Sequence, residues 1–187
     1  MAALRAHNID ARAVDGAGEA RRLVIDLIPE GAEVYSGKSK TLQDAGLFQE
    51  LFESDRYDSV RARYMRMDRQ TQGREIRKLM AAPDFMLGSV QALTEAGDLV
   101  VASASASQLG AYASGAGRLI LVVGSQKIVR DLDEALRRIE ETVFPYEDAI
   151  VRERLNIGTF VGKVLIIRRE FVDGRTTVIL VREPVGV

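Results

Sequence analysis

The chain has 187 residues, of which 26 are basic and 27 acidic, so its net charge of −1 argues against nucleic acid or an anionic membrane as an electrostatic partner. Cysteine is absent and histidine occurs once, which excludes disulfides, a thiolate nucleophile and protein-ligated iron–sulfur clusters, and argues against a histidine metal site. No apolar run reaches the roughly 18–20 residues of a membrane span. The length and the absence of a signal-like start predict one domain, 1–187, of a soluble cytoplasmic protein.

Helices and strands alternate along the first half of the chain. We expect a brief helix before the first strand. The helical spacing of Val24, Leu27 and Ile28 predicts a second helix after it. The pattern predicts strands at 9–14 and 32–35, helices at 18–28 and from Thr41, a strand over Ser59–Tyr64, a helix over Gln72–Ala82, and a strand over Asp84–Leu87.

The second half continues this alternation and then changes character. It contains predicted strands at Leu99–Ala102 and Leu119–Val123, a helix over Gln108–Ala113, and a long amphipathic helix whose stripe runs from Leu132 to Val143. Two further strands, Lys163–Arg169 and Thr176–Arg182, flank Asp173-Gly174, which is a strong hairpin signal. The sequence therefore predicts an α/β fold: a mostly parallel sheet with helices on both faces and a C-terminal antiparallel β-hairpin.

Four polar loops follow predicted strands: Ser36–Thr41, Gly88–Thr94, Ser103–Gln108 and Gly124–Lys127. The carboxyl ends of parallel strands meet at one edge of a sheet, so we expect these loops to line one pocket for a small anionic metabolite. The candidate ligand-binding residues are Gly37, Lys38, Ser39, Thr41, Gly88, Ser89, Gln91, Ser103, Ser105, Ser107, Gln108 and Lys127.

Each loop also has a plain structural interpretation. Gly37-Lys38-Ser39 resembles part of a phosphate loop, but five residues rather than four separate it from Gly31, and the strand lies between them. Thr41 could be a helix cap and Lys127 a solvated surface charge. The serines have no histidine base, so serine hydrolase chemistry is not expected.

Four segments resemble the lactate-utilisation (LUD) domain family along the length of the chain. The similar segments are Ser36–Leu42, Asp84–Glu95, Val122–Ile139 and Gly174–Pro184. The resemblance implies a fold related to sugar-phosphate isomerases, coenzyme A transferases and formyltetrahydrofolate cyclo-ligase. It also implies a role in bacterial oxidation of lactate beside an iron–sulfur partner protein. Val101–Leu109 departs from the family pattern by carrying small hydroxyl residues, which leaves a different small ligand open.

Two hypotheses about function follow. In the first, the protein is a non-redox accessory subunit of organic-acid metabolism that binds a small carboxylate or a phosphorylated metabolite. In the second, it is a coenzyme A transferase-like or isomerase-like enzyme, with Glu95 as the nucleophile that attacks an acyl thioester. Glu95 is also readable as an exposed turn carboxylate, and the terminal hairpin could pair with another chain. Neither hypothesis assigns a cofactor or an oligomeric state.

Overall fold

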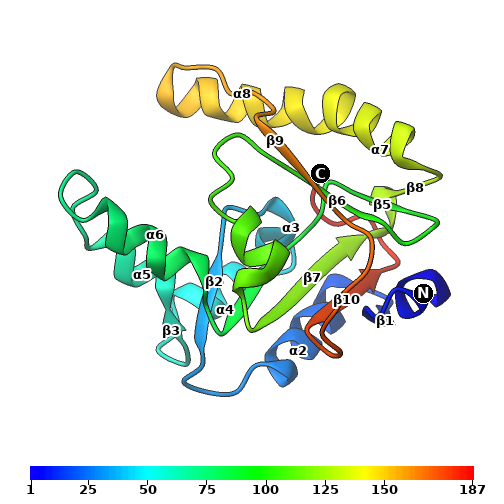
Figure 1. Ribbon diagram of the computed structural model, residues 1–187, viewed down its shortest axis with the longest axis horizontal. Coiled ribbons are helices and arrows are strands. Elements are labelled where there is room, and N and C mark those ends of the chain that lie inside the picture. Colours follow the sequence, from blue (N-terminus) through cyan, green and yellow to red (C-terminus); the bar gives the residue numbers. More distant parts are fainter.

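Two β-sheets organise the protein, whose computed structural model describes residues 1–187 (Figure 1). The large sheet has six parallel strands in the order β1-β10-β7-β4-β2-β3. Its strands are β1 (Asp10–Val14), β2 (Glu33–Ser36), β3 (Asp58–Ser59), β4 (Phe85–Gly88), β7 (Arg118–Gly124) and β10 (Thr176–Val181).

The small sheet has four strands in the order β8-β5-β6-β9 and is mixed. Its strands are β5 (Ala92–Thr94), β6 (Leu99–Ser103), β8 (Ile128–Val129) and β9 (Lys163–Ile167). Strand β6 runs antiparallel to both β5 and β9, while β5 and β8 are parallel.

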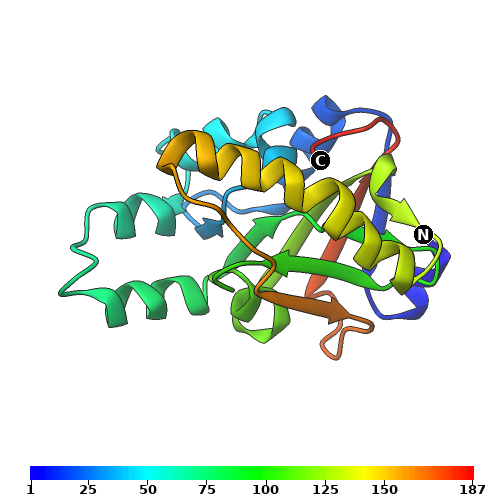
Figure 2. The same cartoon turned by 90° about the horizontal axis from the view of Figure 1, so that it is seen from above.

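Eight α-helices and three shorter helical turns connect the strands. The α-helices are α1 (Ala2–Ala6), α2 (Ala17–Leu27), α3 (Lys40–Asp44), α4 (Leu47–Phe52), α5 (Val60–Met65), α6 (Gly73–Ala81), α7 (Leu132–Arg138) and α8 (Phe144–Leu155). The π-turns are η1 (Ala111–Gly115) and η3 (Ile139–Val143), and the 3₁₀ turn is η2 (Ser125–Lys127). Because η3 joins α7 to α8 without a break, the three form one long rod across the small sheet (Figure 2). None of the helices combines the length and the apolar character needed to cross a bilayer.

Helices α2, α3 and α4 cover one face of the large sheet. Val24 of α2 and Leu51 of α4 belong to the same fully buried cluster as Leu87 and Val122, which are strand residues of that face. Burial of these apolar side chains is the main favourable contribution to the packing of this layer.

The opposite face of the large sheet packs against helices and against the small sheet. Tyr64 of α5 and Leu99 of β6 share a cluster with Leu121 of β7. A third cluster joins Val100 of β6 to Ile139 of η3, so the helical rod covers the outer face of the small sheet. The result is a layered α/β structure, which confirms the predicted fold class of a mostly parallel sheet with helices on both faces.

The predicted C-terminal hairpin is wrong in its pairing. The turn at Gly174 forms, with φ of +69°, and β9 does pair antiparallel, but its partner is β6. Strand β10 instead enters the large sheet between β1 and β7. Its residues are almost all buried, as expected for a continuous apolar run in a central parallel strand, whereas a two-stranded hairpin would leave one face of that run exposed.

Two local predictions also need correction. Ser59–Tyr64 is not a strand: the Ser59 hydroxyl accepts a hydrogen bond from the Ala62 N–H at 3.1 Å and caps α5. Similarly, Ser39 rather than Thr41 caps α3, by accepting from the Leu42 N–H. In both cases a serine side chain caps the first turn of the helix and so fixes where the helix begins.

A buried arginine fixes the π-turn η1 against β10. The Arg175 guanidinium donates to the carbonyl oxygens of Ala111, Tyr112 and Ala116 at 2.9, 3.0 and 3.1 Å, and to the Glu170 carboxylate at 2.7 Å. Arg175 and Glu170 are both buried. This network therefore determines where Tyr112, a residue of the cleft described below, is held.

We predict that Arg175→Met lowers the free energy of unfolding by about 3–5 kcal/mol, because Glu170 is left as an uncompensated buried charge. Arg182→Met is the matched control, since its ion pair with Asp15 is 72% and 82% exposed and should change stability by less than about 0.5 kcal/mol. Urea denaturation measures both. Equal losses in the two variants would contradict the structural role of Arg175.

Candidate functional site

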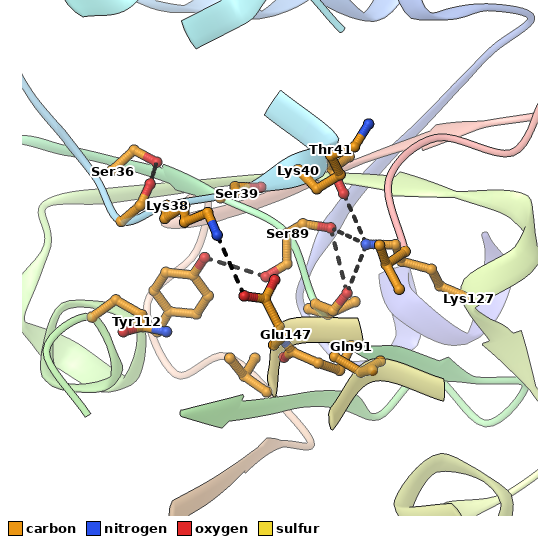
Figure 3. Close-up of a pocket in the computed structure, with 17 residues that line it drawn as sticks. Ser36, Lys38, Ser39, Lys40, Thr41, Ser89, Gln91, Tyr112, Lys127 and Glu147 are labelled. Carbon is orange, nitrogen blue, oxygen red and sulfur yellow. Dashed lines mark hydrogen bonds and ion pairs between the residues drawn. The ribbon is translucent and has the colours of Figure 1, made fainter. Parts of the chain in front are cut away.

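An open cleft lies at the carboxyl ends of β2, β4 and β7, where the polar loops meet (Figure 3). Nine of the residues predicted from the sequence line it: Gly37, Lys38, Ser39, Thr41, Gly88, Ser89, Gln91, Gln108 and Lys127. The parallel sheet accounts for the convergence of the loops after β2, β4 and β7, because each leaves its strand at the same edge, whereas Gln108 comes from the loop after β6 of the small sheet.

Lys127 lies at the floor of the cleft and is only 4% exposed. Its Nζ donates to Thr41 Oγ1 at 2.8 Å, to Ser89 Oγ at 3.1 Å and to the Val90 carbonyl at 3.2 Å (Figure 3). Three segments that are distant in sequence thus meet on one ammonium group. The structure rules out the solvated surface charge that the sequence also allowed for Lys127.

All three acceptors on Lys127 are neutral oxygens, so the buried ammonium has no carboxylate hydrogen-bonded to it. Burial, followed by repulsion from Arg138, lowers the pKa of Lys127 from 10.5 to about 7, and Asp44 opposes this only in part. Because Thr41 Oγ1 accepts from Lys127, its own O–H group remains available as a donor, whereas the Ser89 hydroxyl donates to the Val90 carbonyl at 3.4 Å. The floor therefore offers the Lys127 amine and the Thr41 hydroxyl to an anion.

Arg138, the last residue of α7, supports the cleft from behind. Its Nη1 donates to the Gln91 carbonyl at 2.7 Å and its Nε to the Gln126 carbonyl at 3.4 Å. Arg138 is half-buried, and its hydrogen-bond partners are backbone carbonyl oxygens. Its positive charge lies close enough to Lys127 to lower the pKa of that lysine.

Gly88 is required for the close approach of Tyr112 to the cleft. A Cβ at this position would lie 1.6 Å from the Tyr112 hydroxyl oxygen. The Tyr112 hydroxyl donates to the Ser89 carbonyl at 3.2 Å, and burial raises its pKa, so it stays neutral. Tyr112 thereby holds the Gly88-Ser89 backbone, and with it the Ser89 hydroxyl, at the cleft.

The segment after β10 closes one side of the cleft. Gln126 Nε2 donates to the carbonyls of Val185 and Gly186 at 3.0 and 3.2 Å, and Gln126 Oε1 accepts from the Val185 N–H at 3.3 Å. Gly186 has φ of +80°, and a Cβ there would lie 2.1 Å from Thr41 Oγ1. Only glycine permits this backbone to cover Thr41.

An ion pair spans the mouth of the cleft. Lys38 Nζ lies 3.6 Å from Glu147 Oε2, and the two side chains point toward one another from opposite walls (Figure 3). Lys40 pairs with Asp44 at the rim. With Lys127 below them, these residues leave an excess of positive charge around the cleft.

A second cavity adjoins the first and shares five lining residues with it, Lys38, Gln91, Gln108, Val143 and Glu147. Ser103 and Ser105 line this second cavity rather than the cleft. Ser103 Oγ donates to Gln108 Oε1 at 3.2 Å, so the serine loop and the cleft are connected through Gln108.

Two predicted site residues line neither the Lys127 cleft nor the adjoining cavity. Ser107 donates to Gln108 Oε1 at 3.1 Å but lines a separate hollow beside Tyr35 and Arg61. Glu95 is exposed in the turn between β5 and β6, where its N–H donates to the Val129 carbonyl, and it lines neither the cleft nor the adjoining cavity.

The sequence did not indicate Tyr112, Arg138 or Glu147 as site residues. Tyr112 and Glu147 reach the cleft through the π-turn η1 and the helix α8, whose positions depend on packing between distant segments. Arg138 had one available signal, since it is a cation on a helix that follows a loop containing Lys127, but a basic residue in a last helical turn is ordinarily solvated.

Comparison with known proteins agrees with this fold. A sequence model of the LUD domain matches residues 1–181. None of the curated proteins compared with the chain matches it. Among solved structures, a DUF162 family protein from Deinococcus radiodurans is 15% identical with a TM-score of 0.56, over 97% of this chain and 93% of that chain. At this identity the likeness concerns the fold alone.

We predict that Lys127 makes stability pH-dependent. Its pKa in the folded protein is about 7 against 10.5 when unfolded, so between these values the unfolded chain binds more protons and stability rises with pH. The free energy of unfolding of the wild type, relative to Lys127→Met, should increase by about 1–2 kcal/mol between pH 7.5 and 9. Urea denaturation at both pH values measures this, and a difference that does not change with pH would contradict it.

Proposed function

Because the chain belongs to the LUD domain family, which is linked to lactate utilisation, we propose that it binds a small carboxylate or phosphorylated metabolite as a non-redox subunit of bacterial organic-acid oxidation. The cleft around Lys127 is the proposed binding site.

One observation carries this proposal: Lys127 is a buried ammonium whose three partners are all neutral. Burial lowers the pKa of Lys127 to about 7, so the group readily loses its proton in the empty cleft, and an anion bound there would favour the charged form. The Thr41 hydroxyl accepts from Lys127 and has no acceptor of its own in the protein, so it can donate to the ligand. Gln91 and Gln108 add amide groups at the wall.

The accessory role rests on the family resemblance, which implies that members work beside an iron–sulfur partner protein. This chain has no cysteine and cannot itself hold an iron–sulfur cluster by thiolates. The alternative of acyl transfer through Glu95 has no supporting contact, because that carboxylate is exposed outside the cleft.

We predict that Lys127→Gln weakens the binding of lactate or inorganic phosphate by about 10- to 100-fold, as expected for the loss of a charge-assisted contact. Lys78→Gln, an exposed lysine of α6, is the matched control and should bind like the wild type. Isothermal titration calorimetry measures the dissociation constants. Equal affinities in the two variants would refute the site.

The same titration should depend on pH. An anion favours the charged form of Lys127, whose pKa in the free protein is about 7. Affinity is therefore expected to be highest below that pH and to fall by up to about tenfold per pH unit above it, until the raised pKa of the complex is reached. An affinity that stays constant from pH 6 to 9 would show that the ammonium does not contribute.

The accessory role is tested by growth. Deletion of the gene in the organism that encodes the protein should slow growth on lactate, and the wild-type gene, but not the Lys127→Gln gene, should restore it. The Lys78→Gln gene serves as the control. Unimpaired growth of the deletion strain on lactate would argue for a different organic acid or a different pathway.

A further inference from the structure

We propose that the ligand is an amphipathic anion, with its charged head in the Lys127 cleft and an apolar tail in the adjoining cavity. This inference rests on the proposed anion-binding function and narrows the ligand class. The tail groove is the name used below for the second cavity, which lies between β6 and the rod formed by η3 and α8.

The cleft and the tail groove adjoin. They share five lining residues, among them Gln91, Gln108 and Val143. Lys38 and Glu147 also line both, and their ion pair at 3.6 Å is partly exposed. We take a single ligand to extend from one cavity to the other past this pair.

The two ends differ in the number of charged groups. The cationic groups, Lys127, Lys38 and Lys40, all line the cleft, and the tail groove carries no charged side chain beyond the junction. Eight of its fifteen lining residues are hydrophobic, including Ile139 and Phe144. The Ser103 hydroxyl in its wall is already bonded to Gln108. This arrangement matches an anionic head followed by a hydrocarbon or aromatic tail.

The outer wall of the tail groove is a strap, residues 156–162, that leaves α8 and carries Phe160. Asp148 accepts from the Thr159 N–H at 2.8 Å and from Arg152 at 2.6 Å, so it fastens the strap to α8. Phe160 lines the groove yet remains 65% exposed. A tail packed against this ring would cover apolar surface that no segment of the chain covers.

The test compares short and long anions by calorimetry: propionate with octanoate, and inorganic phosphate with octyl phosphate. We expect each methylene that enters the groove to tighten binding by about two- to fourfold, so each long anion should bind at least tenfold more tightly than its short counterpart. The two pairs also distinguish a carboxylate head from a phosphate head.

Two variants locate the tail and the head. Phe160→Ser should remove most of the chain-length advantage and leave binding of the short anions unchanged. Phe171→Ser is the matched control, because Phe171 is 96% exposed and lines neither cavity, and it should retain the advantage. Lys127→Gln should weaken long and short anions alike.

Several results would overturn the inference. Equal affinity for long and short anions would refute the tail while leaving the anion site intact, whereas no binding of any anion would refute the proposed function itself. A chain-length advantage that survives Phe160→Ser, or octanoate binding that ignores Lys127→Gln, would place the tail or head elsewhere. Sedimentation equilibrium that shows self-association lost in Phe160→Ser would identify a second copy as the occupant of the groove.

Discussion

The cleft depends on one buried ammonium group. By donating to Thr41, Ser89 and the Val90 carbonyl, Lys127 joins the start of α3, the segment after β4 and the turn after β7. The free energy that desolvation of this charge costs is not returned within the chain, since its partners are neutral. Stability and ligand affinity are thus linked through Lys127 Nζ. Its burial lowers the stability of the ligand-free protein and strengthens the binding of an anion.

A second layer of interactions keeps the hydroxyl groups aligned. Arg175, which pairs with Glu170, donates hydrogen bonds to carbonyl oxygens of the π-turn η1. Tyr112 of η1 in turn donates its hydroxyl hydrogen bond to the Ser89 carbonyl. In contrast to Lys127, Arg175 has a carboxylate partner and satisfies its donors inside the protein. The chain therefore separates a neutralised buried cation, which supports structure, from an unneutralised one that faces the cleft.

Most of the cleft could be predicted from the sequence because parallel strands impose a common edge. Gly37, Ser89 and Lys127 follow three different strands and meet for that reason alone. The hairpin could not be assigned correctly, since the partner of β9 is β6, about sixty residues earlier, and a local turn signal carries no information about so distant a strand. Glu147 was missed for the same reason: its approach to Lys38 depends on how the helical rod crosses the small sheet.

The two π-turns have a consequence for how such a site can diverge. Each π-turn contributes a wall residue to the cleft, Tyr112 from η1 and Val143 from η3, and η3 amounts to one extra residue within the helical rod. Because a π-turn takes up about one residue more than an α-turn, deletion of one residue from η3 would leave α8 in nearly its present orientation. Glu147 would still face Lys38, and only the wall around Val143 would change shape. A single-codon deletion could thus alter the fit of a ligand in one step and keep the ion pair at the cleft.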